Sequence, residues 1–457
     1  METSHLMQEV TEAQVLNALK AVNDPDLNRD IVTLGFVKNI KICGQEVAFD
    51  VELTTPACPV KELLKKQAED VVKALPDVRT VNVNMTAQTR GRSVGPSDIL
   101  KGVKNVVAIA SGKGGVGKST ATVNLALSLA ATGAKVGILD ADIYGPSIPG
   151  MLGTTEKPRA TPEGKAIPPV AYGIKIMSVG MLVAEDDATI WRGPIASRML
   201  QQFLGAVEWG ELDYLLMDLP PGTGDVQLTL TQSAPITGAV IVTTPQDVSL
   251  KIARKGLRMF QKVNVPILGI IENMSGFICP NCSTVHNIFR KGGGERIAKD
   301  IGVPFLGAIP LDPRMVEAGD MGQPLVALDT RSPGAQAFEA VARKMAAQIS
   351  IANVKDAEVQ NRPKEVHLTD MTPPQILWED GTTSVYTHVD LRFACPCAAC
   401  KNEMTGEQVL QRQDVKPDVR VVESRPVGKY GLNLIFNDGH SSGIYVFDLL
   451  RTLGKMQ

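Results

Sequence analysis

Short apolar runs alternate with helical stretches through the middle of the chain. Between Val103 and about Ala347 the apolar runs are VVAIAS, VGILDAD, IKIMSVG, YLLMDLP, AVIVTTP, ILGIIEN and FLGAIPL. Runs that stay apolar at consecutive positions are typical of strands covered on both faces, so the pattern predicts a mostly parallel sheet with right-handed helical crossovers. We therefore expect an α/β core domain over residues 99–355.

A small α+β domain is predicted before this core. Its periodicity indicates a helix over 12–22, a strand pair over 36–53 that turns at Gly44-Gln45, a helix over 61–75 and a strand over 78–85. The polar stretch over 86–101 carries Gly and Pro without apolar periodicity, which is typical of a linker. We place this first domain at residues 1–98.

A third domain is predicted after the charged stretch at 354–367. Its aromatic residues lie on short strand-like runs, with turns at Asp380-Gly381 and Asp438-Gly439. This pattern predicts a small β-rich domain over residues 370–457.

Composition and charge limit the classes of binding partner that we expect for this chain. The 457 residues carry 47 Lys and Arg against 49 Asp and Glu, so the chain lacks the basic field of a nonspecific nucleic-acid binder. No run reaches the roughly 18 apolar residues of a spanning helix, and the start of the chain resembles neither a signal nor a transit peptide. We expect a cytoplasmic protein with neither a nucleic-acid nor a membrane partner.

The sequence GKGGVGKST matches the phosphate-binding pattern G-x-x-x-x-G-K-[ST] and lies between a predicted strand and a predicted helix. The glycines let backbone N–H groups converge on phosphate oxygens, and the helix N-terminus adds partial positive charge. Lys118 would reach the β- and γ-phosphates, and the Ser119 hydroxyl would meet Mg²⁺. The residues expected to bind ATP are Gly112, Lys113, Gly114, Gly115, Val116, Gly117, Lys118, Ser119 and Thr120.

Carboxylates follow two predicted strands that should end beside this loop. Asp218 would hold Mg²⁺ through water, with Asp140 near the metal shell, and Asp142 could orient or deprotonate the attacking water. A strand-end Asp by itself usually forms a turn or caps a helix, but two of them downstream of a phosphate loop favour the catalytic interpretation.

Cys279 and Cys282 form the motif CPNC after a predicted strand. One CxxC supplies only half of a four-thiolate site. The same loop of a second copy in a two-fold dimer could supply the other half, so that a 4Fe-4S cluster would lie on the axis. Half of a structural zinc site and a thioredoxin-like redox pair are the alternatives.

Two further cysteine positions stand out. Cys58 lies between a predicted strand and a helix, where the helix N-terminus should lower its pKa and make it a reactive thiol or a transient ligand; a buried, inert Cys is the alternative. The motif CPCAAC places Cys395, Cys397 and Cys400 within six residues, which predicts a metal site with His440 as the best fourth ligand.

Several motifs of the core resemble known families. Lys113 is not needed to bind phosphate within one chain, and with it the loop resembles the deviant phosphate-loop ATPases, the group that contains MinD, the partitioning ATPases and nitrogenase reductase. Over residues 102–345, SGKGGVGKST, DADIYGPS, WRGP, DLPPGTGD and ENMS together resemble the Mrp/ApbC family of iron-sulfur cluster carriers. The resemblance implies that Lys113 reaches the partner's nucleotide, Asp142 aids hydrolysis, Asn273 meets the adenine edge and the CxxC pair holds a bridging cluster. A solvated loop lysine is the alternative for Lys113.

The flanking domains resemble families as well. DPDLNRDIVTLGFV and TTPACP resemble the SufT/PaaD-like domain of iron-sulfur assembly proteins, which favours a functional Cys58. WEDG and GHSSGIYVFDLLR resemble the N-terminal domain of γ-butyrobetaine hydroxylase, which implies zinc at the CPCAAC site, with a second iron-sulfur site as the alternative. The domain order resembles the chloroplast high-chlorophyll-fluorescence scaffold proteins and their bacterial relatives.

Together these resemblances imply a homodimeric ATPase that carries a 4Fe-4S cluster. Upstream assembly factors would supply the cluster, and apoproteins would receive it. The rival hypothesis is a MinD/ParA-like positioning or partitioning ATPase that uses no cluster.

Overall fold

The computed structural model describes residues 10–91, 99–143, 145–182, 193–222, 224, 227, 230–231, 233–279, 282, 284–369, 373–402, 407–427 and 431–456. The chain divides into two compact units. The first contains Val10 and residues 18–353, and the second contains residues 354–457 together with 11–17. The predicted domain boundaries stay predictions, and helix α11 (Pro333–Gln360) runs through the boundary expected at 355.

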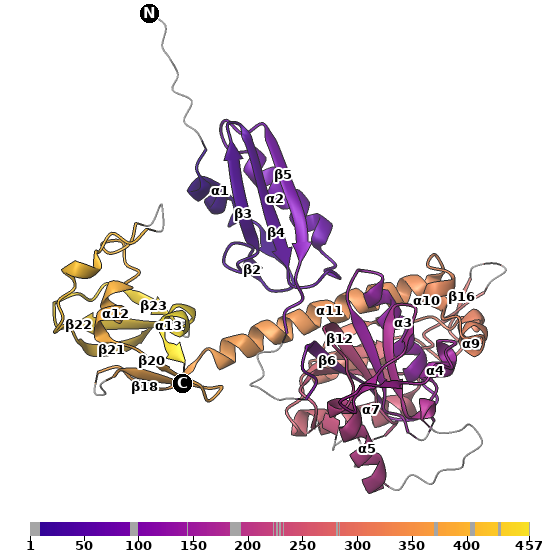
Figure 1. Cartoon of the computed structure of the whole chain (residues 1–457). Coiled ribbons are helices and arrows are strands. Elements are labelled where there is room, and N and C mark those ends of the chain that lie inside the picture. Colours follow the sequence, from indigo (N-terminus) through magenta and orange to yellow (C-terminus); the bar gives the residue numbers. More distant parts are fainter. Residues whose placement is uncertain are drawn as a thin grey trace, which may run out of the picture. The chain divides into compact units, whose positions relative to one another are not determined.

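One large sheet organises the first unit (Figure 1). Within the described residues it has eight strands, all parallel to their neighbours except β10, which pairs antiparallel with β11. In spatial order the strands are β10 (Val170–Ala171), β11 (Ile174–Ser178), β7 (Val136–Asp140), β12 (Leu212–Asp218), β6 (Val103–Ser111), β13 (Ile236–Thr243), β14 (Ile267–Glu272) and β17 (Phe305–Ala308). Each of the seven apolar runs supplies one parallel strand, so the predicted parallel α/β core is confirmed.

Both faces of the sheet are buried, as the continuous apolar runs require. Along β6, Val107 and Ile109 join one hydrophobic cluster, whereas Val106, Ala108 and Ala110 join the other. The first cluster contains residues of α3 (Lys118–Ala130) and α11; the second contains residues of α5 (Gly193–Gly205), α7 (Asp247–Lys262) and α8 (Gly293–Ile301).

The first unit also contains several shorter elements. They are α4 (Ile148–Met151), the 3₁₀ turn η1 (Val179–Met181), α9 (Pro313–Asp320), α10 (Leu325–Leu328), and the hairpins β8 (Arg159–Ala160) with β9 (Ala166–Ile167) and β15 (Phe277–Ile278) with β16 (Val285–His286). Within the described part of the chain, no helix has the length and apolar character needed to cross a lipid bilayer.

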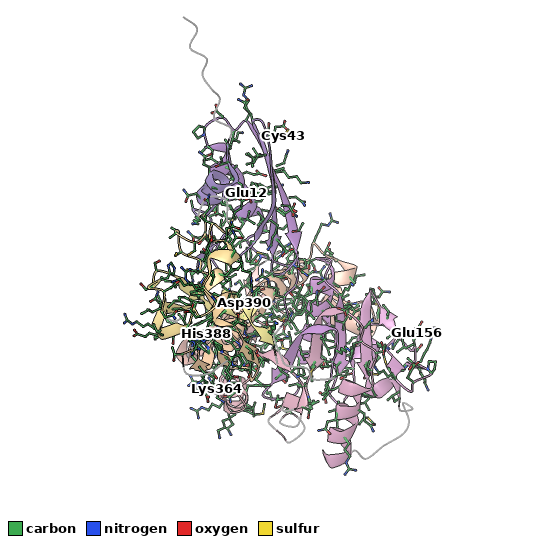
Figure 2. The ribbon with its side chains drawn as sticks, turned by 60° about the vertical axis from the view of Figure 1, so that its left-hand side comes forward. Glu12, Cys43, Glu156, Lys364, His388 and Asp390 are labelled. Carbon is green, nitrogen blue, oxygen red and sulfur yellow. The ribbon has the colours of Figure 1, made fainter. Side chains whose placement is uncertain are left out.

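The N-terminal α+β fold agrees with the predicted elements. Strand β4 (Glu46–Leu53) pairs antiparallel with β3 (Val37–Cys43) and parallel with β5 (Thr80–Ala87). Cys43 is exposed at the end of β3, where the hairpin turns (Figure 2). The other elements are α1 (Glu12–Leu19), β1 (Asn23–Asp24), β2 (Arg29–Asp30) and α2 (Lys61–Lys73).

The C-terminal part is rich in short strands, as predicted. One sheet contains β18 (Pro363–His367), β19 (Gln375–Trp378), β20 (Thr383–Val385) and β24 (Lys455–Met456); the other contains β21 (Val421–Val427), β22 (Gly431–Phe436) and β23 (Ile444–Val446). Helices α12 (His388–Phe393) and α13 (Phe447–Leu453) and the 3₁₀ turn η2 (Arg412–Asp414) join them. Gly381 and Gly439 adopt positive φ at the two predicted turns.

Candidate nucleotide and metal sites

The glycine-rich loop connects the end of β6 to the start of α3. Gly115 and Gly117 have φ of 75° and 79°, a conformation that favours glycine. Gly117 is also the N-cap of α3, and no side chain caps that helix end. A Cβ at position 117 would clash with the amide nitrogen of Asn273. The loop therefore directs backbone N–H groups at the sheet's carboxyl edge, where an anion would bind.

Lys118 begins α3 and is paired with two carboxylates, those of the buried Asp218 and the partly buried Asp142. Its Nζ lies 2.6 Å from Asp218 Oδ2 and 3.5 Å from Asp142 Oδ2. The Asp218 side chain is fully buried, and it also accepts hydrogen bonds from Ser119 Oγ and Thr122 Oγ1, each at 2.6 Å. The structure thus brings together Lys118, which is predicted to bind phosphate, and Ser119 and Asp218, which are predicted to bind Mg²⁺.

Asp140 lies beside Asp218 because the two residues pair in register at the ends of β7 and β12. Ser178 Oγ donates to Asp140 at 2.9 Å, and the backbone N–H groups of Asp142 and Ile148 donate at 3.2 and 3.4 Å. Burial and then the charge of Asp218 raise the pKa of Asp140 to about 7. Two close, buried carboxylates repel each other and cost free energy unless a cation neutralises them, so Asp140 and Asp218 could bind a divalent ion.

Two cavities adjoin the loop and share Gly117, Thr120 and Met151 as lining residues. A cavity of about 200 Å³ has the phosphate-loop residues on its wall, with Lys113 and Asp142 among them. The second cavity, of about 150 Å³, is lined by Asn273, Met274, Pro310, Leu311, Asp312, Met315, Val316, Gly319 and Asp320 in addition to the shared residues. Asn273 is buried, and its Nδ2 donates to the carbonyl of Val116 at 2.9 Å.

Cys279 and Cys282 lie in the loop of the β15–β16 hairpin. Phe277 pairs with His286 and Ile278 with Val285, and the N–H of Cys279 donates to the carbonyl of Thr284 at 3.0 Å. Cys282 is exposed, and its Sγ lies within hydrogen-bond distance of Thr284 Oγ1, at 3.2 Å. The pKa of Cys282 is lowered, first by the Thr284 hydroxyl and N–H and then by Cys279, because these donors stabilise a thiolate. The pair therefore offers accessible sulfur ligands.

The expected low pKa of Cys58 is wrong. The backbone N–H of Val60 acts in the expected direction, but burial outweighs it, and with the nearby charges of Asp24 and Asp26 the pKa of Cys58 rises to about 11. The side chain is buried ahead of α2. Desolvation favours the neutral thiol more than a helix N-terminus favours the thiolate.

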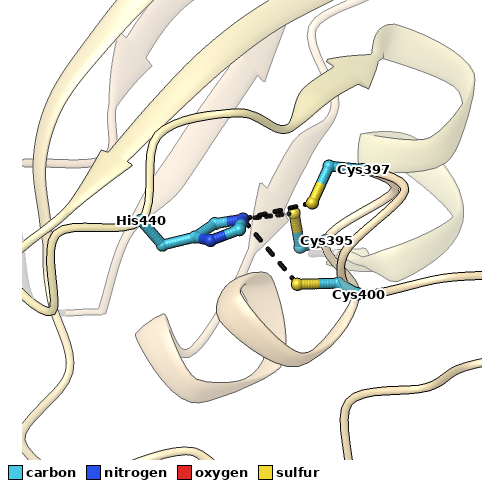
Figure 3. A group of neighbouring side chains, drawn as sticks. All are labelled: Cys395, Cys397, Cys400 and His440. Atoms are coloured by element: carbon cyan, nitrogen blue, oxygen red, sulfur yellow. Dashed lines mark hydrogen bonds between the residues drawn. The ribbon is translucent and has the colours of Figure 1, made fainter.

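The structure brings Cys395, Cys397, Cys400 and His440 together in the second unit (Figure 3). Their ligand atoms all lie within 4.8 Å of one another, and His440 Nε2 is 3.1, 3.4 and 3.7 Å from the three sulfurs in sequence order. Gly443 is required here, because a Cβ at that position would lie 2.6 Å from Cys395 Sγ. The four residues could hold a metal ion.

Arg392 and Asp438 support this group. Arg392 donates from Nη1 to Cys400 Sγ at 3.3 Å and from Nε to Asp438 Oδ2 at 2.7 Å. Asp438 also accepts the backbone N–H of His440 at 3.0 Å. The guanidinium of Arg392 lies 5.7 Å from the ring centroid of Phe436. One arginine thus contacts a sulfur and the turn that presents the histidine.

Several residues of these sites are not predicted by the sequence. Thr122 and Ser178 hydrogen-bond the two buried carboxylates, Asp218 and Asp140, and Arg392 contacts the Cys400 thiol. Thr122 lies one helical turn after Lys118, so helix periodicity could have shown that both face β12. Ser178 contacts Asp140 across 38 residues and Arg392 contacts Asp438 across 46, and one sequence carries no signal for contacts at such separations.

The fold and the loop define a P-loop NTPase, a nucleotide-binding enzyme. Comparison with known proteins gives the family: the NUBPL iron-transfer P-loop NTPase profile matches residues 102–346, an iron-sulfur cluster assembly profile matches 12–85, and a profile of γ-butyrobetaine hydroxylase-like N-terminal domains matches 369–451. The chain belongs to the NUBPL iron-transfer P-loop NTPase family.

Two relatives agree with this assignment, and a solved structure is similar to part of the chain. An iron-sulfur cluster carrier protein of Synechocystis is 48% identical over 75% of this chain and 99% of its own length. The chloroplastic Fe-S cluster assembly factor HCF101 of Arabidopsis thaliana is 40% identical over 98% of this chain and 84% of its own length. A solved nucleotide-binding protein of Archaeoglobus fulgidus, in complex with ADP, is 40% identical over 51% of this chain and 92% of that chain, with a TM-score of 0.46.

Proposed function

We propose that this chain is an ATP-dependent iron-sulfur cluster carrier. Two copies would share a 4Fe-4S cluster at Cys279 and Cys282, and the cluster would pass from upstream assembly factors to recipient apoproteins. The observation that carries the proposal is an accessible CxxC pair on a hairpin of the same compact unit as the phosphate loop, in a chain whose relatives are named as carriers.

The nucleotide site fits ATP and Mg²⁺. The loop offers backbone donors at the N-terminus of α3, and Lys118 and Lys113 line the adjoining cavity. Ser119, Asp140 and Asp218 supply the hard oxygen atoms that Mg²⁺ prefers. When bound, Mg²⁺ would neutralise charge on the phosphates and on the carboxylate pair. Asp142 would orient the attacking water, Asn273 would meet the adenine, and Lys113 would act across the dimer.

Cys279 and Cys282 suit a cluster that is bound for a time and then transferred to another protein. Cys282 is exposed and its pKa is lowered, so its sulfur is available as a thiolate ligand. Two sulfurs per chain complete four cluster ligands only when two chains meet. A cluster held by so few residues of each subunit is accessible to a recipient protein, which suits transfer.

Cys395, Cys397, Cys400 and His440 would hold zinc. A tetrahedral ion with Zn–S bonds of about 2.3 Å and Zn–N bonds of about 2.0 Å places nitrogen and sulfur roughly 3.5 Å apart. The three distances of 3.1–3.7 Å agree with this value. In a 4Fe-4S cluster each ligand binds a different iron, so the ligand atoms lie farther apart than they do around one ion. The geometry therefore favours zinc over a second cluster.

The rival hypothesis of a positioning or partitioning ATPase does not account for the CPNC hairpin. A location in the cytoplasm stays a prediction, since the relatives include bacterial carriers and a factor named as chloroplastic.

Anaerobic reconstitution with iron and sulfide tests the proposal. The double variant Cys279→Ala/Cys282→Ala should lose the cluster that the wild type gains, while Cys43→Ser, which removes an exposed cysteine of the β3–β4 hairpin, should load as the wild type does. All three proteins keep the C-terminal cysteines, so any iron bound there cancels in the comparison. Equal iron and sulfide content in the double variant and the wild type would refute the proposal.

A further inference from the structure

One continuous segment carries both the expected adenine contact and the cysteine pair. It starts at Glu272, the last residue of β14, and reaches the first turn of α8 at Gly294. Asn273 is its second residue, and Cys279 and Cys282 lie in its hairpin. The contacts at the ends of this segment therefore contribute to the position of the cysteines relative to the nucleotide cavity.

Glu272 holds both ends together. Its side chain is fully buried, and its Oε1 accepts the N–H of Gly292 at 2.9 Å while Oε2 accepts the N–H of Gly294 at 2.6 Å. Ser275 Oγ donates to the same Oε1 at 2.5 Å. One carboxylate thus joins the start of the segment to the N-terminus of α8, where the helix dipole favours negative charge.

The approach of Glu272 to α8 depends on glycine. A Cβ at position 294 would lie 3.0 Å from the Cβ of Glu272, and Gly292 adopts a φ of 79°. Substitution would strain the backbone at 292 and crowd the carboxylate at 294. The contact with Glu272 therefore explains glycine at positions 292 and 294, whereas at position 293 a Cβ would lie 2.7 Å from both the Leu250 side chain and the carbonyl oxygen of Pro245.

Backbone bonds connect the same segment to the wall of the 150 Å³ cavity. Ile309 N–H donates to the carbonyl of Glu272, Ser275 N–H donates to the carbonyl of Ile309, and Leu311 N–H donates to the carbonyl of Gly276, each at 2.8 Å. Phe277, the first residue of the hairpin, also bridges to Leu311. Asn273, Met274 and Leu311 line the cavity, so its wall continues directly into the cysteine hairpin.

We propose that Glu272 is a positioning residue that couples nucleotide binding to the state of Cys279 and Cys282. The inference rests on the proposed function and adds the physical connection within one subunit. A nucleotide in the cavity contacts the chain at Asn273, near the start of the segment. Glu272 holds the other end of the segment at α8. Displacement of Asn273 therefore moves the cysteine hairpin, which lies between the two ends. Without the carboxylate, the segment adjusts at its α8 end and the hairpin keeps its position.

The test measures thiol reactivity and uses no cluster. The full-length protein, anaerobic and without iron or sulfide, is alkylated with iodoacetamide in the presence and absence of Mg·ADP, and peptide mass spectrometry gives a separate rate for Cys282. The wild type should show about a fivefold change in the Cys282 rate on nucleotide binding. In Glu272→Gln, which keeps the shape but loses the charge, the ratio of the two rates should fall to near one. A purely structural role would change both rates alike and leave their ratio intact.

Glu295→Gln is the matched control, since Glu295 is exposed in the first turn of α8 and its substitution removes the same charge. It should keep the wild-type ratio. If Glu272→Gln fails to fold or to bind ADP, Ser275→Ala is used as the test variant in its place. It removes one hydrogen bond to Glu272 and should reduce the ratio of the Cys282 alkylation rates with and without Mg·ADP. A wild-type ratio in Glu272→Gln, or in Ser275→Ala where that variant decides, would overturn the proposal, as would a wild type that shows no nucleotide-dependent change. Cluster loading is measured separately, so failure of the carrier function is distinguishable.

Discussion

The ammonium group of Lys118 lies 2.6 Å from the carboxylate of Asp218, and both side chains are buried. This ion pair joins the first residue of α3 to the last residue of β12. Because both groups are buried, Asp218 depends on Lys118 for its compensating charge, whereas Lys118 also has the Asp142 carboxylate 3.5 Å away. The pair therefore contributes to stability as well as to the nucleotide site.

Lys118→Ala should abolish nucleotide turnover and lower the free energy of unfolding by about 3 kcal/mol, because a buried carboxylate loses its partner. The double variant Lys118→Ala/Asp218→Asn should recover much of the stability and stay inactive. Phosphate release and denaturant unfolding measure the two effects. Normal turnover in Lys118→Ala would contradict the assigned role of the loop.

Asp142→Ala should slow hydrolysis by about 100-fold while nucleotide still binds, because Asp142 is proposed to orient or deprotonate water. Lys118 retains Asp218 as its partner in this variant. Single-turnover phosphate release and fluorescent-nucleotide titration separate the two steps. A large loss of affinity with unchanged cleavage would assign Asp142 to binding instead.

The core was predictable because its signals are local. The seven apolar runs and the strand–loop–helix context of GKGGVGKST each depend on consecutive residues, and all lie where expected. Cys395, Cys397 and Cys400 are close in sequence, so their proximity was also expected, and the turn at Asp438-Gly439 brings His440 to them.

The features that the sequence did not predict depend on tertiary packing. The pKa of Cys58 was predicted in the wrong direction because helix position can be read from sequence, whereas the burial that outweighs it cannot. Glu272 contacts Gly292 and Gly294, and Arg392 contacts Asp438, across separations of 20, 22 and 46 residues. A single chain carries no local pattern for such pairs.

Cys58 and Cys282 should differ sharply in alkylation. At pH 8 Cys282 should react much faster, because the thiolate is the nucleophile and the pKa of Cys58 is raised to about 11. The rate at Cys58 should rise only as the pH approaches 11 or when the protein is unfolded in denaturant. Comparable rates for the two cysteines at pH 8 in folded protein would show that Cys58 is a reactive thiol after all.

Arg392→Met should increase the rate of zinc loss to a chelator by about tenfold, since Arg392 contacts Cys400 and the turn that carries His440. Arg425→Met is the control, because Arg425 forms an exposed pair with Glu423 on β21. A colorimetric chelator follows the release. Equal rates in the two variants would remove Arg392 from the support of the metal site.

The shared cluster is tested most directly by native mass spectrometry of the full-length protein after anaerobic reconstitution. The account predicts a species of two chains with one 4Fe-4S cluster that depends on Cys279 and Cys282, in addition to any zinc. A single chain that carries a complete cluster through these two cysteines would contradict it.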